Sequence, residues 1–502
     1  MRLSIFVRRS VISLLGVLAL SLSVAYAQTP NVCVSKSANN ERGRHGLGAA
    51  YSQTQNGLAY PIDLQTTLRL AGAQNLDIRI ARSELQKARA NQLMAWEQFL
   101  PWLSTGAVFE RRDGLSFSSG NGAINEAHYG YNLPGFTVVG RVPVGDAIFN
   151  ALSARQLVRA SGNALNAQWQ NSSLAAAMSY FDTLEAKARA NVERQAAAIS
   201  ATYQKELHHA VVTGIAFKGD ELRIQTETER YQIAVRLWLQ HQRDASAKLA
   251  DILRMDSTID LVPEDSDLMP IMLFDTQAPL ESLVQQAYSA RPELRESQAL
   301  IAAANAQRKG VTYGPIIPTL STAMFFGSLN GGWGNYWGER AIDTAGPITG
   351  PHTRGYVQQY PGGQNGGATQ DILFGVNWRI GPGGLGDVGA IRVANARLNT
   401  EQLRGQKMLD EVTRQVVQSF TRVRSYYDQI ALARRNISSA RETLRLTEGR
   451  KDYGVGNVLE VIQAQQALER ASTEYVVAMA EFNKAQYELS RAVGGLLPGN
   501  AR

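Results

Sequence analysis

The stretch "GVGNVLEVIQAQQALERASTEY", residues Gly454–Tyr475, begins with two glycines and continues as a strong helix former. A weaker copy of this pattern, "GIAFKGDELRIQTETERYQ", occupies Gly214–Gln232, 240 positions earlier. Glycine weakens the interior of a helix but suits the left-handed backbone that ends one helix before another begins. The two stretches therefore predict tight turns at Gly214 and Gly454, each joining two helices.

The helix that follows Gly454 carries a strict seven-residue repeat. Large side chains form one line of it: Val461, Leu468, Tyr475, Phe482 and Leu489. Alanines form a second line: Ala464, Ala471, Ala478, Ala485 and Ala492. Large and small residues that alternate at this spacing let two helices approach closely, as in a coiled coil. The earlier copy keeps one such line: Ile224, Tyr231, Trp238, Ala245 and Ile252.

The rest of the chain also duplicates itself. The segment "LPWLSTGAVF" (Leu100–Phe109) pairs with "IPTLSTAMFF" (Ile317–Phe326), and an offset of 240 residues superposes Glu229 on Glu469. Matches in a shared order and spacing predict a two-fold internal repeat. Each half is predicted as a helix, a β-hairpin, a very long helix, a tight turn and a second long helix.

Six stretches have a helical pattern: 62–98, 150–211, 217–255, 280–312, 386–451 and 457–493. A helix of about 60 residues extends roughly 90 Å at 1.5 Å per residue. A periodic pattern of this length favours coiled coils over a globular domain.

The clearest strand is "DILFGVNWRI", residues 371–380. Ile372, Phe374 and Trp378 fall on one side of it, and that side is wholly apolar over about ten residues, the length that a tilted strand needs to cross a bilayer. Trp378, near one end, suits an interfacial aromatic girdle. The alternative is a half-buried strand in a soluble sheet. Weaker candidates cover Trp102–Glu110, Phe136–Val144 and Thr319–Gly327.

Four strands leave two unpaired edges, which lipid does not tolerate, so such a sheet must close with copies of itself. The second hairpin, about 317–381, carries a glycine-rich loop from Gly327 to Gly367 with interspersed aromatic residues. A loop of this composition is expected at a water-exposed end of the sheet.

The N-terminus indicates export. A basic start with Arg2 and Arg8 precedes the apolar run Val11–Val24 and the small-residue site Ala25–Ala27, which together predict a signal peptide over residues 1–27. Residues 28–60 are polar and predicted to be disordered. Cys33 is the only cysteine, so no intramolecular disulfide can form.

Composition excludes several classes of protein. The 502 residues have a net charge of +7 and a mean hydropathy of −0.21, which excludes a bundle of membrane helices. Basic residues are dispersed among acidic ones, so no nucleic-acid partner is predicted. No nucleotide-binding, metalloprotease or serine-hydrolase motif is present, and His208 and His209 lie about 100° apart on a helix, unlike two ligands of one metal. We expect no enzyme activity, no cofactor and no metal site.

These features resemble the TolC-type outer-membrane efflux family, the outer membrane factor of tripartite efflux and type I secretion systems. The family's pattern at the second turn is matched by Gly454, Asn457, Glu460, Val461 and Ile462, and Gly214, Phe217 and Asp220 take the equivalent places in the first half. The corners "VPVGDAIFNA" and "RIGPGGLGDVGA" also look like the family's entry from strand into long helix. Asn457 and Phe217 replace the usual hydroxyl residue, which leaves adaptor specificity open.

The resemblance implies an α+β membrane protein: a homotrimer whose 12-stranded β-barrel in outer-membrane lipid is continuous with a long α-helical coiled-coil barrel in the periplasm. It implies a passive exit duct that receives cargo from an inner-membrane RND or ABC transporter through a periplasmic adaptor protein. Adaptor docking is expected at the helix turns, at Gly214, Phe217, Gly219, Gly454, Gly456 and Asn457. The periplasmic aperture is expected at Asp220, Glu460, Arg223 and Tyr453.

The predicted organisation is a signal peptide (1–27), a disordered segment (28–60), a first repeat (61–260, hairpin about 101–145), a linker (261–279), a second repeat (280–495) and a tail (496–502). The alternative function is a periplasmic coiled-coil scaffold without channel activity. Neither the exported cargo nor the type of pump follows from the sequence.

Overall fold

The computed structural model describes residues 52–54, 57–117, 124–265, 268–331, 365–452 and 457–495. The signal peptide, Cys33, most of the glycine-rich loop, the C-terminal tail, and Tyr453, Gly454 and Gly456 of the second turn lie outside these residues. Among the described residues, no helix combines the length and the apolar character that a membrane crossing needs.

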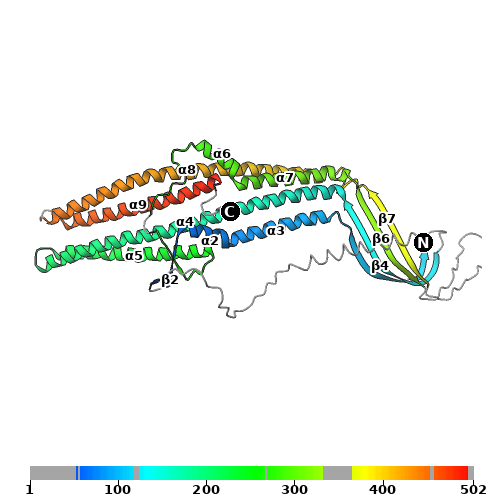
Figure 1. Cartoon of the computed structure of the whole chain (residues 1–502), viewed down its shortest axis with the longest axis horizontal. Helices are drawn as coiled ribbons and strands as arrows, with labels where there is room; N and C mark the ends of the chain where they lie inside the picture. The colour runs from blue at the N-terminus through cyan, green and yellow to red at the C-terminus, as the bar shows by residue number, and fades with distance from the viewer. Residues whose placement is uncertain are drawn as a thin grey trace, which may run out of the picture. The chain divides into compact units, whose positions relative to one another are not determined.

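The two halves of the chain have the same order of elements (Figure 1). The first half contains α2 (Leu64–Gln74), α3 (Leu76–Glu97), β3 (Trp102–Phe117), β4 (Ile124–Pro143), α4 (Val144–Val212) and α5 (Lys218–Leu253). The second contains α6 (Leu280–Ala290), α7 (Pro292–Tyr313), a 3₁₀ turn (Gly314–Ile316), β6 (Thr319–Gly331), β7 (Asn365–Asn377), α8 (Val388–Asp452) and α9 (Val458–Val493).

Two helices predicted as continuous are interrupted. The predicted helix 62–98 breaks at Asn75, whose side chain accepts hydrogen bonds from the N–H groups of Asp77 (2.8 Å) and Ile78 and so caps α3. The predicted helix 280–312 breaks before Pro292, the first residue of α7, because proline has no N–H to continue the preceding helix. The helix predicted from residue 150 begins at Val144, directly after the last residue of β4.

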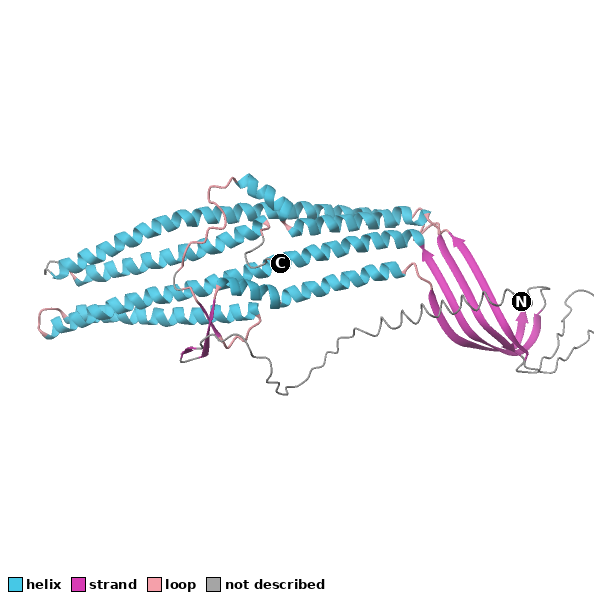
Figure 2. Cartoon of the chain, viewed as in Figure 1, coloured by secondary structure: helices cyan, strands magenta, loops and turns pink. Residues whose placement is uncertain are grey.

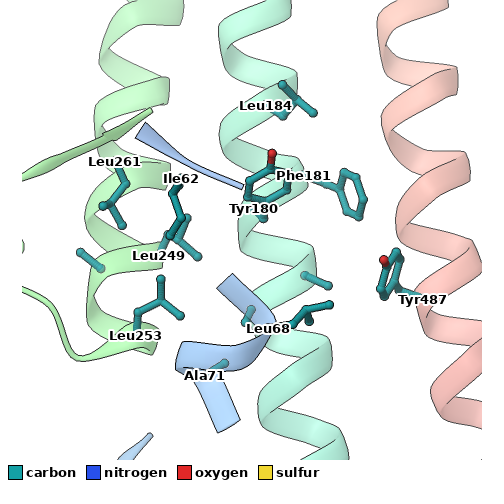
Figure 3. Packing of buried hydrophobic residues seen from close by; sticks show 13 residues of the cluster. Ile62, Leu68, Ala71, Tyr180, Phe181, Leu184, Leu249, Leu253, Leu261 and Tyr487 are labelled. Carbon is teal, nitrogen blue, oxygen red and sulfur yellow. The ribbon is translucent and has the colours of Figure 1, made fainter. Parts of the chain in front are cut away.

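A small sheet was not predicted. It joins β1 (Ser52–Thr54), β2 (Gly57–Ile62) and β5 (Asp260–Pro263), and β2 runs parallel to β5. The predicted disordered segment therefore ends in strands, and the predicted linker begins inside β5. Ile62 and Leu261 of this sheet lie in a buried cluster with residues of α2, α4 and α5, and Phe181 of α4 contacts Tyr487 of α9 (Figure 3).

The predicted heptad seam faces inward. Helix α4 packs along α5, α8 packs along α9, and α4 also contacts α9. Every alanine of the α9 repeat is buried, as are Val461, Phe482 and Leu489, whereas Leu468 and Tyr475 are half-buried. This burial confirms that the alternation of large and small residues marks the helix-helix interface.

The remaining strands form one antiparallel sheet in the order β3-β4-β6-β7 (Figure 2). All four strand predictions are confirmed, and each strand is longer than predicted at one end: β3 continues to Phe117, β4 starts at Ile124, β6 continues to Gly331 and β7 starts at Asn365. At its other end β7 stops at Asn377, earlier than predicted, which leaves Trp378 and Ile380 beyond the strand. The indole N–H of Trp378 donates instead to the carbonyl of Ile316 at 3.2 Å.

Candidate functional site

The four-stranded sheet has one apolar face. Leu103, Val138, Met324 and Ile372 are paired in one row across the sheet. Because side chains alternate between faces with a period of two, residues two positions along share this face. They are largely apolar: Phe136, Val142, Leu320, Phe326, Phe374 and Val376. The rings of Phe136 and Phe326 stack with centroids 5.3 Å apart.

The opposite face is more polar. Arg141 is paired with Ser321 and, beyond it, with Gly375, and Thr137 is paired with Phe325 and Asp371. Ile372 and Phe374 were thus assigned to the correct face, and Trp378 continues their line past the strand end.

The sheet has two unpaired edges within the described residues, because β3 and β7 each pair on one side only. Large apolar side chains remain uncovered on these outer strands, including Phe109 on β3 (62% exposed) and Phe374 on β7 (70% exposed). Monomeric soluble proteins rarely leave such a continuous apolar surface open to water, so this face marks an interaction surface.

The turn between α4 and α5 confirms the tight turn that was predicted at Gly214. Gly214 has φ of +76°, the left-handed region that glycine adopts without strain. The N–H of Ile215 donates to the carbonyl of Ala210 at 2.8 Å, and the N–H of Gly214 donates to that of Val211 at 3.0 Å. These bonds satisfy carbonyls at the end of α4 and turn the chain sharply into α5.

Gly219 is required for a different reason, which is space for a neighbouring side chain. Phe217 is the N-cap of α5, and a Cβ atom at Gly219 would lie 2.4 Å from the ring of Phe217. A glycine at this position therefore lets the ring fold over the first turn of α5. Phe217 remains 74% exposed and Ile215 83% exposed, so the turn carries two large apolar side chains on its surface.

The second turn contributes Asn457, whose side chain accepts a hydrogen bond from the N–H of Leu459 at 3.1 Å and caps α9. Residues near the two turns pack together in one buried cluster: Tyr203, Leu207 and Ile224 with Leu444, Val461, Ile462 and Ala464. The two helical hairpins are thus joined close to their turns.

The predicted aperture residues that the structure describes, Asp220, Arg223 and Glu460, form ion pairs within their own hairpins. Asp220 accepts from Arg223, three residues along the same helix, at 3.4 Å. Glu460 lies 3.7 Å from Arg450 of α8. Each acidic group therefore has a basic neighbour, and Arg223 is paired with a residue of its own helix.

Three charged groups with several partners each were missed from the sequence. Glu221, next to Asp220, accepts from Lys218 at 2.6 Å and contacts His208 across the turn at 2.9 Å. These hydrogen bonds, the one from Lys218 first, hold the pKa of Glu221 below its usual value. The i, i+3 spacing of Lys218 and Glu221 was a usable signal. Arg291 and Lys484 are both buried, and their partners lie far away in the sequence: Gln415 for Arg291, and Asp182 and Glu185 for Lys484.

His208 serves as a partner of Glu221, and the rings of His208 and His209 have centroids 6.2 Å apart. In the part of the chain that the structure describes, no group of three His, Cys, Asp or Glu side chains is arranged to hold a metal ion.

The described residues thus combine an antiparallel sheet that has an apolar face with long helical hairpins joined directly to it. Residues 283–495 match the family model described as "Outer membrane efflux protein". This match confirms the TolC-type resemblance over the second half of the chain. No curated protein matches the sequence.

Solved structures extend the same fold over nearly the whole chain. A membrane protein from Pseudomonas aeruginosa is 18% identical, with a TM-score of 0.70 over 91% of this chain and 99% of that one. The Campylobacter jejuni CmeC outer membrane channel is 14% identical, with a TM-score of 0.71 over 93% and 96%. The open-state Neisseria gonorrhoeae MtrE outer membrane channel is 15% identical, with a TM-score of 0.65 over 91% and 97%.

Proposed function

We propose that this protein is the outer-membrane exit duct of a tripartite export system. It conducts cargo passively and has no catalytic turnover. One observation supports the proposal most: the sheet has an apolar face and two unpaired edges, and its strands continue into helical hairpins.

The edges require more than one copy of the chain in lipid. Unpaired backbone N–H and C=O groups cost several kcal/mol each in hydrocarbon, so β3 of one copy must pair with β7 of the next. Three copies close a barrel of twelve strands, the number that the family resemblance implies. The face with Phe374 and Met324 then contacts lipid, and the face with Arg141 and Asp371 lines the water-filled interior.

The helices continue this duct into the periplasm. A second copy beside each hairpin covers the faces that α3, α5 and α8 leave open, and the turns form the far end. The exposed Ile215 and Phe217 side chains provide a docking surface for the helical hairpin of a periplasmic adaptor. Gly214, Gly219 and Asn457 shape this surface. An RND or ABC transporter in the inner membrane supplies the energy.

Planar-bilayer recording of the purified full-length protein tests the proposal. Discrete conductance steps are expected, and the protein should stay with outer membranes after a high-salt wash. Absence of conductance from a correctly folded protein would contradict the duct, and release by salt would favour the alternative, a periplasmic coiled-coil scaffold.

The acidic residues near the turns are expected to control ion passage. Replacing Asp220 and Glu460 together by alanine removes two carboxylates per chain from the proposed aperture, so single-channel conductance should rise or cation preference should fall. Glu442→Ala is the matched control, because Glu442 is exposed on α8 and paired with Arg445 of the same helix. If the double variant keeps wild-type conductance and selectivity, Asp220 and Glu460 do not line the aperture.

A further inference from the structure

The strands pass into the long helices at one end of the sheet, where β4 continues into α4 and β7 is followed by α8 (Figure 1). A polar cavity of about 310 Å³ lies at this junction. Two arginines line it: Arg141, near the end of β4, and Arg379, just beyond the end of β7. Asp146, in the first turn of α4, is the one carboxylate among the lining residues. The charged groups that line the cavity therefore sum to a net charge of +1.

Arg141 lies on the more polar face of the sheet, beside small residues. Its register partner on β6 is Ser321, and Gly375 of β7 follows in the same row. Arg141 is exposed, and its guanidinium forms no hydrogen bond or ion pair with any residue that the structure describes. The described acidic residues on this face of the sheet, Glu110 and Asp371, lie farther from the helices than Arg141 does. The charge of Arg141 is therefore uncompensated within the sheet.

The glycine-rich corner "GPGGLG", which follows β7, folds around Arg379. The guanidinium of Arg379 donates to the carbonyl of Gly383 at 3.3 Å, and a Cβ atom at Gly384 would lie only 2.2 Å from the carbonyl oxygen of Arg379. Asp387 closes the corner by accepting from the N–H groups of Gly383 (2.8 Å) and Ala390 (2.9 Å). The corner thus needs glycine to fit against Arg379, and its own acid is held by backbone donors.

The two arginines exceed the acid that faces them. Burial raises the pKa of Asp146, and the charge of Arg379 acts against that rise. When it is ionised, Asp146 compensates only one of the two positive charges in the cavity, so the other remains available to an anion. Arginine suits this task because its planar guanidinium stays charged and binds carboxylate and phosphate groups through paired N–H donors.

We propose that Arg141 and Arg379 form an anion-attracting collar at the base of the barrel, which favours cargo that carries carboxylate or phosphate groups. The location of the collar rests on the proposed function, in which the face with Arg141 lines the water-filled interior. Each chain then supplies two guanidinium groups and one carboxylate to the same level of the duct. A passage with low-dielectric walls and an excess of one sign of charge concentrates ions of the opposite sign. The collar is opposite in sign to Asp220 and Glu460 at the other end of the duct.

The rates at which charged reagents modify a cysteine in the cavity test the collar. Asn377→Cys, at an exposed position that lines the cavity, is placed in a Cys33→Ser background of the full-length protein in detergent. The rates with an anionic, sulfonate-bearing methanethiosulfonate and with a cationic, trimethylammonium-bearing one are compared at low salt. Adding Arg141→Gln should lower the ratio of the anionic to the cationic rate by about tenfold, the lower end of the effect that charged clefts have on local ion concentration. Adding Arg141→Lys, which keeps the charge, should preserve the ratio. A ratio that Arg141→Gln leaves unchanged would overturn the proposal.

Arg111→Gln is the matched control, because it removes the same charge from the opposite face of the sheet. Arg111 lies on β3 an even number of residues from Leu103, and it is paired with Asp113 of the same strand at 2.7 Å. The rate ratio at Asn377→Cys should stay at its original value in this variant. An equal fall in Arg111→Gln and Arg141→Gln would contradict a local collar, because it would show that the total charge of the chain sets the ratio.

Planar bilayers separate the collar from the duct itself. In a KCl gradient, Arg141→Gln should shift the reversal potential toward greater cation preference, opposite to the shift expected when Asp220 and Glu460 are replaced. A channel that conducts with an unshifted reversal potential would contradict the collar and leave the duct standing. A protein that does not conduct would contradict the proposed function, whereas the rate ratio still decides whether Arg141 attracts anions.

Discussion

Replacing Arg291 by alanine is expected to cost about 3–5 kcal/mol of folding stability, because it breaks a buried ion pair with Glu293 and removes the hydrogen bonds from its guanidinium to α8 and α9. Arg291 is 1% exposed. Its guanidinium donates to Glu293 (3.0 Å), to Gln415 of α8 (2.9 Å) and to the carbonyls of Arg491 (3.3 Å) and Ala492 (3.1 Å) at the end of α9. One side chain thus joins the junction between α6 and α7 to both α8 and α9.

Thermal unfolding of the detergent-solubilised protein, followed by helical circular dichroism, measures this loss. Arg295→Ala is the control, because Arg295 lies one turn farther along α7 and makes an exposed bond to the carbonyl of Ser289. Arg291→Lys keeps the charge but loses the forked geometry, so its melting temperature should fall between those of wild type and alanine. A melting temperature of Arg291→Ala equal to that of Arg295→Ala would show that this network does not support the fold.

Replacing Phe374 by arginine is expected to prevent assembly in the membrane. An arginine on the lipid face of a transmembrane strand costs about 2–4 kcal/mol near the bilayer midplane, and each trimer would carry three copies. Phe374 shares the apolar face with Ile372 and Val376. The amount of assembled protein in outer-membrane fractions should therefore fall sharply.

Leu373→Arg is the matched control, because the neighbouring residue faces the other side of the same strand. It is paired with Ala323, on the face that carries Arg141 and Asp371. We expect Leu373→Arg to assemble at close to wild-type levels. Equal loss in both variants would contradict the assignment of the lipid face.

Periodic features could be predicted from the sequence because they depend on local spacing. The heptads of α9, the alternation in β7 and the glycine at 214 each correspond to an observed interface, face or turn. The resemblance to the efflux family rested on the same residues, and the family match to 283–495 confirms it.

Features that depend on distant partners could not be predicted. The pairing of β2 with β5 brings together segments about 200 residues apart, and neither is long enough to show a pattern. The interruption at Asn75 reflects a side-chain cap within an otherwise periodic helix. The partners of Lys484 could not be recognised either, because only the packing of α4 against α9 brings it to Asp182 and Glu185.

The central claim is that unpaired strand edges oblige this chain to close a barrel with its own copies. Native mass spectrometry of the full-length protein, extracted from outer membranes in mild detergent, tests it most directly. We predict a single dominant species of three chains that remains intact after the detergent is removed in the gas phase. A correctly folded protein that appears only as one chain would contradict the account.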